Sequence, residues 1–319
     1  MAASESRLIA QLLQAGVARA DVRLGIGDDA AVLAPPPGQE LVVTTDVLVE
    51  GAHFLPGAPA QSLGHRALAV NLSDVAAMGA TPAWALLSLV LPAADAAWLE
   101  QFVLGFGALA RRHGVALVGG NLARGPLSIT VQLTGLLPAG SALRRGGAAA
   151  GDRLYVSGTP GDANAWHAVS AGVLQAAPVD AAFLRQRFEY PTARVALGQA
   201  LAGIASACID VSDGLYADLD RLLQASGCCA RVDLARLPLS PALARVAGAE
   251  AWRRALAGGE DYELCFTVPP QRVQALEAAL AAPDAVRCIG VLQPGAGIEL
   301  NADGAVKQFS HSGYDHFPA

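Results

Sequence analysis

The stretch NLSDVAAMGATP, residues 71–82, lies where a long helical pattern ends and a strand pattern begins. Apolar residues recur at helical spacing over 62–78, and Gly79 with Pro82 beyond it is typical of a helix end. An alternating strand is expected before this helix, over 41–49, and an apolar strand after it, over 84–91. This order predicts a domain that mixes helices and strands.

The remaining elements of the first half extend this order. Asp95 has the position of a helix start and Gly114 that of a helix end. Two strands are expected next, over 115–118 and 127–137, and the second alternates clearly. The domain then has the order β-α-β-α-β-β, and we place it at residues 1–140.

The second half begins after 138–151, a segment that is rich in Gly, Ala and Ser and ends in Gly-Asp. We place a second domain, which also mixes strands and helices, at residues 150–319. The expected strands are 153–157, 208–211, 231–234, 262–268 and short strands over 286–309; the expected helices are near 161–175, 193–205, 214–225 and 271–281. The fold class is therefore α+β, with two mixed α/β domains.

Composition limits the kind of protein. The chain has 319 residues, of which 53% are hydrophobic, and this length is more than one compact core usually holds. No apolar run reaches the ~18–20 residues of a membrane helix. The N-terminus lacks the basic start and unbroken apolar segment of a signal peptide, so we expect a cytoplasmic location and no membrane partner. A net charge of −6 without a basic tract argues against nucleic-acid binding.

Cysteine and lysine usage exclude several kinds of site. The five cysteines are odd in number and form no C-x-x-C, which indicates thiols in a reducing compartment rather than disulfides or zinc. Lys307 is the only lysine, so neither a phosphate-binding loop with its lysine nor the strand lysine of protein kinases is present. If the protein handles ATP, metal ions and arginines must neutralise the phosphates.

Two acidic segments of the first half stand where apolar packing would be expected. Asp28 and Asp29 follow two glycines, and a turn with solvated aspartates accounts for them equally well. Asp46 follows Thr44 and Thr45 inside a predicted strand, where aspartate is disfavoured. Hydroxyl and carboxylate oxygens are ligands of hard cations, although a strand at the edge of a sheet would also tolerate Asp46.

Two further acidic segments share this property. Asn71 and Asp74 lie on one face of the apolar helix, and a carboxylate there is costly unless it is paired, metal-bound or in solvent. Asp210 lies inside a strand that runs through Ser212 and Asp213 into a helix. Either of the last two could cap that helix, but capping does not explain Asp210. The dominance of oxygen ligands favours Mg²⁺ over zinc or copper.

Taken in order, these segments resemble the thiamine-monophosphate kinases of the aminoimidazole ribonucleotide synthetase superfamily. The matching stretches are GIGDDAAVL (25–33), TTDVLVEGAHF (44–54), NLSDVAAMGATP (71–82), GGNLARGPLS (119–128), SGTPGD (157–162), IDVSDGL (209–215), GGEDYEL (258–264) and GYDHF (313–317). They span nearly the whole chain.

The resemblance implies a homodimer whose N-terminal domains pair their strands into a shared β-barrel, with ATP near the dimer cleft. It implies direct transfer of the ATP γ-phosphoryl group to thiamine monophosphate, with several Mg²⁺ ions and no general base, in thiamine pyrophosphate biosynthesis. By position, the implied Mg²⁺ ligands are Asp29, Thr44, Thr45, Asp46, Asp74, Asn121, Asp210 and Asp213. The implied ATP contacts are Gly120, Asn121, Arg145 and Ser212, and the implied thiamine-side contacts are His53, Glu260 and His311.

This sequence departs from the family pattern at two positions. Asn121 stands where the family commonly has a metal-binding aspartate, so one negative charge is lost. His311 stands where the family often has a tryptophan that stacks on thiamine. Four of the implied contacts also have ordinary structural roles open to them. His53 could cap a strand, and Glu260 could belong to a turn. Arg145 could be a solvated linker residue, and His311 a solvated C-terminal residue.

Rival functions fit the sequence less well. A related ATP-dependent synthetase would share the aspartate clusters but not the combination of HF (53–54), GGEDYEL and GYDHF. A non-catalytic nucleotide- or metal-binding dimer is favoured only by Asn121. A metal-dependent phosphatase finds no support, because nothing in the sequence places a water nucleophile.

Overall fold

The computed structural model describes residues 5–280, 286–302, 304–310 and 313. Within it the chain forms two compact units. One holds Met1–Val75 and Ala80–Gly140, and the other holds Ala76–Gly79 and Ser141–Ala319.

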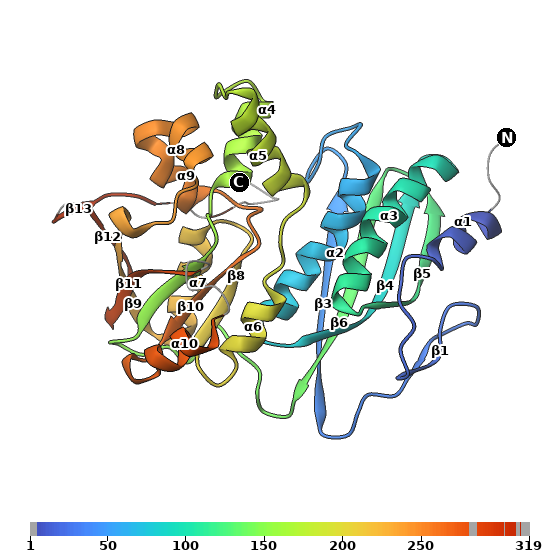
Figure 1. Cartoon of the computed structure of the whole chain (residues 1–319), viewed down its shortest axis with the longest axis horizontal. Helices are drawn as coiled ribbons and strands as arrows, with labels where there is room; N and C mark the ends of the chain where they lie inside the picture. The colour runs from blue at the N-terminus through green and yellow to red at the C-terminus, as the bar shows by residue number, and fades with distance from the viewer. Residues whose placement is uncertain (1–4, 281–285, 303, 311–312, 314–319) are drawn as a thin grey trace. The chain divides into compact units, whose positions relative to one another are not determined.

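The N-terminal unit is built on a four-stranded sheet with the order β3-β6-β4-β5 (Figure 1). Only the β4–β5 pair is parallel. Its elements are α1 (Glu5–Leu12), β1 (Val22–Leu24), β2 (Val32–Leu33), β3 (Gln39–Val49), α2 (Ala60–Ala77), β4 (Thr81–Leu91), α3 (Ala96–His113), β5 (Ala116–Arg124) and β6 (Ser128–Pro138). From β3 onward this is the predicted order β-α-β-α-β-β.

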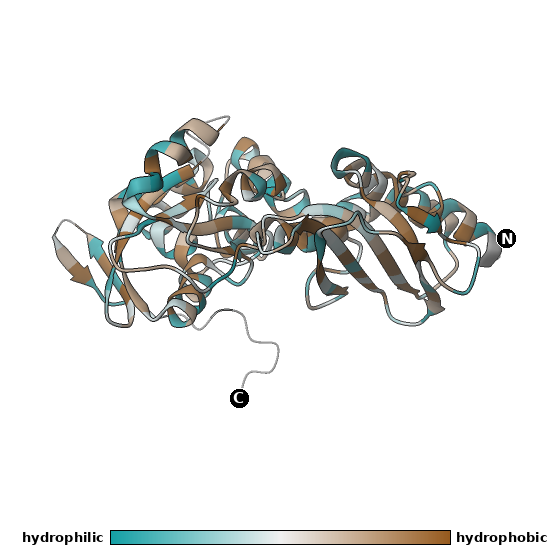
Figure 2. Ribbon diagram, turned by 90° about the horizontal axis from the view of Figure 1, so that it is seen from below, coloured by the Kyte–Doolittle hydropathy of each residue, from teal (hydrophilic) through white to brown (hydrophobic). Residues whose placement is uncertain are grey.

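Helices α2 and α3 lie against one face of this sheet (Figure 1). Figure 2 shows the strands of the sheet as largely brown, with these helices on one side of it. The two helices approach so closely that a Cβ on Gly105 would stand 1.9 Å from the carbonyl oxygen of Gln61. As predicted, α3 begins at Asp95, whose carboxylate accepts the N–H groups of Ala97 and Trp98, and ends at the left-handed Gly114.

The hairpin of β1 and β2 was not predicted from the sequence. Val22 and Leu33 of this hairpin pack against an apolar cluster that contains Trp84. Asp21 precedes the hairpin and accepts two hydrogen bonds from Arg19, at 2.9 and 2.7 Å, and one from the indole of Trp84 at 3.1 Å. Strands of two or three residues are too short to show a period of their own.

The C-terminal unit is built on a seven-stranded sheet with the order β13-β12-β9-β11-β7-β10-β8. Only the β12–β9 pair is parallel. Its strands are β7 (Arg153–Ser157), β8 (Ala207–Val211), β9 (Cys228–Asp233), β10 (Glu263–Val268), β11 (Val286–Pro294), β12 (Gly297–Ala302) and β13 (Ala305–Lys307). Its α-helices are α4 (Asp162–Ser170), α5 (Pro178–Glu189), α6 (Val195–Leu201), α7 (Leu215–Ser226), α8 (Pro241–Ala247), α9 (Ala251–Ala257) and α10 (Val273–Ala279).

The core of this unit lies between the sheet and helices α7 and α9. Leu154, Val156 and Ile209 on the strands meet Leu219 and Leu222 of α7 in one buried cluster. Helices α5, α8 and α9 were not predicted. The last two have seven residues each, which is too few for an apolar period to be recognised. Across the described residues, no helix is long and apolar enough to cross a membrane.

Candidate functional site

In the N-terminal unit, Thr44 and Asp74 form a side-chain pair. The hydroxyl of Thr44 on β3 donates to Asp74 Oδ2 on α2 at 2.5 Å. Thr44 and Asp46 lie on the face of β3 that meets α2, because side chains two residues apart in a strand share a face. The packing of α2 on β3 thus brings together residues that lie 30 positions apart.

Thr45 lies on the opposite face of β3. Its side chain is exposed, and its hydroxyl donates to the carbonyl oxygen of Val131 at 3.1 Å. Asp29 lies in an exposed turn, where its N–H donates to Asp28 Oδ1 at 2.8 Å. Neither residue joins the Thr44–Asp74 pair through a hydrogen bond.

Gly120 and Asn121 lie at an exposed part of β5. Gly120 has a φ of +156°, and a Cβ on it would stand 1.9 Å from the carbonyl oxygen of Leu87. Because β4 passes so closely, glycine is required here by packing. Asn121 stands opposite Ser88 in the pairing of β4 with β5.

His53 caps the end of β3, one of the two roles that the sequence allowed. Its Nδ1 accepts the N–H of Val49 at 3.0 Å. A neutral imidazole that accepts at Nδ1 carries its proton on Nε2. The predicted contact of His53 with substrate stays a prediction.

In the C-terminal unit, two segments that the sequence singled out lie side by side. The N–H of Glu260 donates to the carbonyl oxygen of Ser212 at 2.8 Å, and that of Tyr262 donates to Val211 at 2.9 Å. In the sheet, Leu264 of β10 pairs with Asp210 of β8. Asp210 is only 5% exposed. Strand pairing thus brings Asp210, Ser212 and Glu260 into one site.

Asp218 organises the turn between β8 and α7. The sequence left open that Ser212 or Asp213 caps α7, but Gly214 holds the cap position without a side-chain bond. Instead Asp218 Oδ2, in the helix, accepts the N–H groups of Ser212 and Asp213 at 3.0 and 2.9 Å. Burial raises the pKa of Asp218 to about 6, although these N–H groups act against the shift.

Arg221 contacts both aspartates of this turn. Its Nη1 lies 2.7 Å from Asp213 Oδ2 and 2.5 Å from Asp218 Oδ1. A guanidinium beside two carboxylates holds Asp213 in place and partly neutralises it. The turn therefore offers one cation as well as carboxylate oxygens.

Glu260 and Tyr262 have left-handed backbones, with φ values of 71° and 53°. They are the non-glycine residues with positive φ in the described part of the chain. Such a conformation costs about 1–3 kcal/mol per residue and persists only where the surroundings enforce it. Backbone strain therefore concentrates at the predicted substrate contact.

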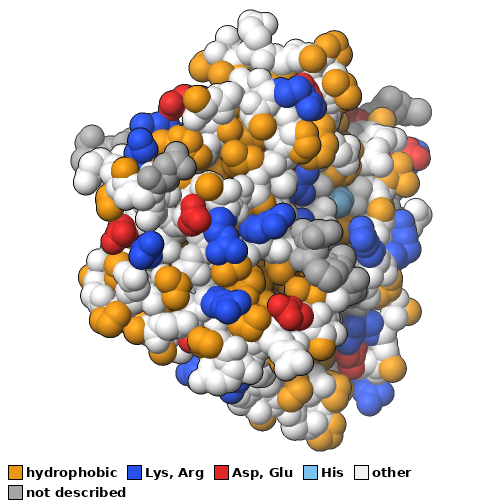
Figure 3. Space-filling view, turned by 60° about the vertical axis from the view of Figure 1, so that its left-hand side comes forward, with side chains coloured by type: hydrophobic (Ala, Val, Ile, Leu, Met, Phe, Trp, Pro, Cys, Tyr) orange, Lys and Arg blue, Asp and Glu red, His pale blue; other side chains and the backbone are white. Residues whose placement is uncertain are grey.

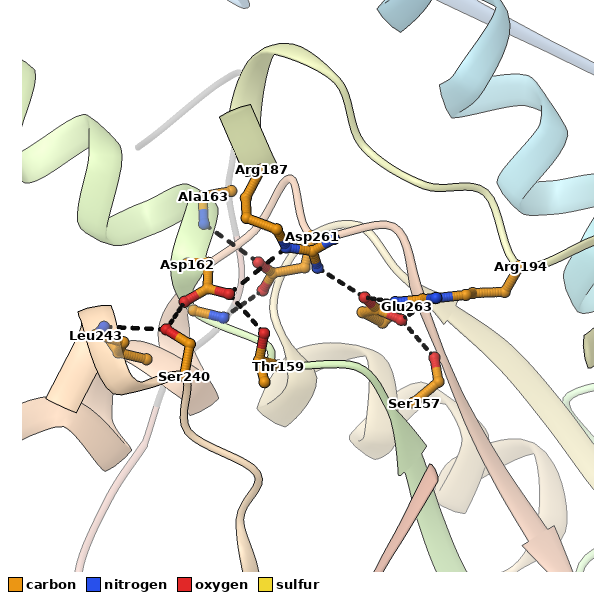
Figure 4. Close-up of polar contacts among 11 residues, drawn as sticks. Ser157, Thr159, Asp162, Ala163, Arg187, Arg194, Ser240, Leu243, Asp261 and Glu263 are labelled. Carbon is orange, nitrogen blue, oxygen red and sulfur yellow. Dashed lines mark hydrogen bonds and ion pairs between the residues drawn. The ribbon is translucent and has the colours of Figure 1, made fainter. Parts of the chain in front are cut away.

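A buried ion network adjoins the strained segment (Figure 4). It is centred on Glu263, which has no exposed surface and pairs with Arg187 and Arg194. Burial acts to raise the pKa of Glu263, but the two arginines outweigh it and lower the pKa. Burial raises the pKa of Asp261 well above 3.8, against the opposing hydrogen bond from Gly161.

Arg145 is not brought to this site. The carbonyl oxygen of Arg145 accepts the hydroxyl of Ser226, at the C-terminal end of α7, whereas Ser212 lies before its N-terminal end. A helix of 12 residues separates them by about 18 Å. Contact of Arg145 with ATP stays a prediction. His311 and most of GYDHF lie outside the described residues.

Basic side chains gather near the middle of the face shown in Figure 3. With one lysine in the chain, nearly all basic side chains are arginines.

A cavity of about 810 Å³ in the C-terminal unit is lined by Arg153, Arg231 and Arg236, together with Asp233. None of the predicted site residues lines it, so the cavity does not mark the predicted site.

The predicted Mg²⁺ ligands carry the type of donor atom that Mg²⁺ binds. Thr44, Asp46 and Asp74 present hydroxyl and carboxylate oxygens, the donors that Mg²⁺ prefers. No group of three or more His, Cys, Asp or Glu side chains able to hold a metal occurs in the part of the chain that the structure describes. The predicted ligands belong to both units, and their convergence stays a prediction.

Comparison with known proteins decides the family. A model of the N-terminal domain of AIR synthase related proteins matches residues 27–137, and a model of their C-terminal domain matches residues 149–303. The thiamine-monophosphate kinase of Salmonella typhimurium is 49% identical over 324 residues, which cover 99% of both chains. The chain belongs to the thiamine-monophosphate kinases. The relative from Haemophilus influenzae is 41% identical over 330 residues and also covers 99% of both chains.

Solved structures of thiamine-monophosphate kinases have the same fold. The crystal structure from Stenotrophomonas maltophilia has a TM-score of 0.85 and 44% identity, and covers 96% of this chain and 99% of its own. AaThiL complexed with AMPPCP and TMP has a TM-score of 0.79 and 35% identity, over 92% of both chains. Escherichia coli HypE, a hydrogenase maturation protein, has a TM-score of 0.77 at 24% identity over 96% of both chains, a likeness in fold alone.

Several charged residues beside the predicted site were not singled out from the sequence. Asp218 and Glu263 are buried carboxylates, and Arg187, Arg194 and Arg221 are their partners. Glu263 stands inside the GGEDYEL stretch and begins an otherwise apolar strand, which was a usable signal. The arginines of Glu263 lie 69 and 76 positions from it, so sequence spacing could not pair them with it.

Proposed function

We propose that this kinase transfers the γ-phosphoryl group of ATP directly and in line to the phosphate of thiamine monophosphate. The observation that carries the proposal is the hydrogen bond between Glu260 and Ser212, which sets a predicted substrate contact beside a predicted nucleotide contact. The acceptor is a phosphate monoester with a second pKa near ~6, so it is largely ionised at neutral pH. The transfer therefore needs positioning and charge neutralisation rather than a general base.

Charge neutralisation is the main task of the site. Two like charges about 4 Å apart repel by roughly 4 kcal/mol at an effective dielectric of ~20. Bound Mg²⁺ would neutralise the phosphates of both substrates and hold them in line. We assign its binding to Asp29, Thr44, Thr45, Asp46, Asp74, Asn121, Asp210 and Asp213. Arg221, held between Asp213 and Asp218, adds a cation to the same turn.

A homodimer accords with the open face of the N-terminal sheet. On β3 the side chains of Leu41, Val43 and Val47 are 51%, 63% and 43% exposed, and Leu86 on β4 is 40% exposed. In the sheet pairing, Thr45 and Leu86 both stand opposite Gln132 of β6, so these residues share one face. A second copy of this sheet would bury that apolar face in a shared barrel. A cytoplasmic location is proposed from the sequence alone.

The decisive experiment supplies the purified protein with ATP, Mg²⁺ and thiamine monophosphate and follows thiamine pyrophosphate and ADP by chromatography. We expect the two products in equal amounts. Thiamine is the control acceptor and should give no product, because it lacks the ionised phosphate. ADP without thiamine pyrophosphate, or phosphorylation of thiamine itself, would contradict the proposed reaction.

A further inference from the structure

The segment that carries Glu260 is anchored through Glu263, three residues further on. The Glu263 carboxylate accepts hydrogen bonds from Arg194 Nε and Nη2, both at 2.6 Å, and from Arg187 Nη2 at 2.7 Å. Ser157 donates to the same carboxylate at 2.5 Å and accepts the N–H of Leu264 at 2.9 Å. Figure 4 shows these groups converging on one buried carboxylate from three separate segments.

Asp261 forms a second anchor within the strained segment. It accepts the N–H groups of Gly161 and Ala163, at 2.6 and 3.3 Å, at the start of α4. Asp162 of the same helix accepts hydroxyl hydrogen bonds from Thr159 and Ser240, both at 2.5 Å. Arg187 Nε lies 3.5 Å from Asp162 Oδ2, so one arginine links Glu263 to the start of α4.

Glu260 and Tyr262 alternate with these anchors along the chain. Their own N–H groups bond to Ser212 and Val211, and the Tyr262 hydroxyl donates to Glu260 Oε2 at 3.2 Å. Left-handed backbone at residues with side chains needs an outside constraint. The buried charge-assisted hydrogen bonds of Glu263 are the strongest contacts that the structure offers for this purpose.

We propose that Glu263, Arg187 and Arg194 are positioning residues that hold residues 260–262 in the strained conformation that presents Glu260 to thiamine monophosphate. The proposal rests on the proposed role of Glu260 as a substrate contact. None of the three side chains needs to touch the substrate. Their effect should therefore fall more on the binding of thiamine monophosphate than on that of ATP.

The test compares the wild-type protein with Glu263→Gln, which keeps the shape of the side chain but removes its charge. Hydrogen exchange followed by mass spectrometry reports on the N–H groups of Glu260 and Tyr262. We expect their exchange to speed up about tenfold and the KM for thiamine monophosphate to rise about tenfold, since small misplacements of a binding group have large kinetic effects. The KM for ATP should rise less than the KM for thiamine monophosphate, because the segment meets the predicted ATP contact Ser212 only through the backbone of both.

A matched control is available on the helix that carries Arg187. Asp180 of α5 is buried and pairs with Arg245, whose Nη2 lies 2.5 Å from Asp180 Oδ1. Asp180→Asn removes another carboxylate–arginine pair, whose Arg245 side chain is 60% exposed, without touching the Glu260 segment. We expect wild-type exchange at residues 258–264 and a wild-type KM for thiamine monophosphate. An equal effect of both variants would show a general structural role and overturn the proposal.

A second variant decides the case if Glu263→Gln does not fold. Arg194→Lys keeps the charge but loses the two-pronged contact with Glu263. It should produce the same two changes to a smaller degree. Unchanged exchange at Glu260 and Tyr262 in the folded variant would overturn the proposal. A wild-type protein that forms no thiamine pyrophosphate would instead contradict the proposed function, while the exchange data would still show whether the network holds the segment.

Discussion

Asp74 is a predicted Mg²⁺ ligand in the N-terminal unit. It lies on α2 beside apolar residues and accepts the hydroxyl of Thr44 at 2.5 Å. A half-buried carboxylate in this position is costly to the fold unless it has partners. The metal-binding role that we propose for Asp74 would account for a carboxylate among Leu72, Val75 and Ala76.

We expect Asp74→Asn to reduce turnover at least ~100-fold with the fold intact, because one charge that balances the cation is lost. Thiamine pyrophosphate formation measures the rate, and circular dichroism measures the fold. Asp95→Ser is the control, since serine also caps helices well. Near-normal turnover in Asp74→Asn would remove this residue from the metal site.

A substitution at Asn121 should improve the use of Mg²⁺, whereas Asp74→Asn should impair it. Asn121→Asp restores a charge at an exposed position on β5, so it should lower the Mg²⁺ concentration for half-maximal rate. The shift should be roughly two- to tenfold for one added carboxylate ligand, on the order of 0.4–1.4 kcal/mol. The measurement is a Mg²⁺ titration at constant free ATP. An unchanged titration curve would exclude Asn121 from the ion's surroundings.

Among the elements, the β1–β2 hairpin is attached by an ion pair as well as by its apolar contacts. Arg19 bonds to the carbonyl oxygen of Gly114, at the end of α3, and to Asp21. Asp21 in turn accepts the indole N–H of Trp84 on β4. The pair thus ties together the hairpin, the helix end and the sheet.

The Arg19–Asp21 pair should make stability depend on pH. The hydrogen bond from Arg19 is the main cause that lowers the pKa of Asp21 below its ordinary value of 3.8. A carboxyl group whose pKa is lowered on folding stabilises the fold at pH values above its pKa in the unfolded chain. This stabilisation is lost as the pH falls through its pKa in the folded protein. Asp21→Asn should cost about 1–2 kcal/mol of unfolding free energy at pH 7. Urea unfolding should show this difference shrinking below pH ~4, and a constant difference would contradict the assignment.

For the molecule as a whole, the exposed apolar face of the N-terminal sheet leads us to expect a dimer. Light scattering should give a mass about twice 32.5 kDa for the wild-type protein. Val43→Glu puts a charge on the face that the dimer would bury and should shift the protein toward the monomer. Val179→Glu, at a residue of α5 that is 72% exposed, is the matched control and should not. A monomeric wild-type protein would refute the shared barrel.

Local patterns along the chain were enough to predict the elements that are long and regular. The strand and helix order from β3 to β6 was predicted, as were both ends of α3, because alternation, helical period and caps are local signals. The α+β class followed from this order. The hairpin, α5, α8 and α9 were not predicted, since their segments are too short or too mixed to bury a face by themselves.

Only the tertiary structure shows which polar residues contact one another. Thr44 faces Asp74 while Thr45 faces the other way, a distinction that the pleat of β3 makes. Asp218, rather than Ser212 or Asp213, holds the turn before α7, and Arg187 and Arg194 reach Glu263 across 76 and 69 positions. Such contacts depend on strand pairing and helix packing, which bring distant residues together and leave no period in the sequence.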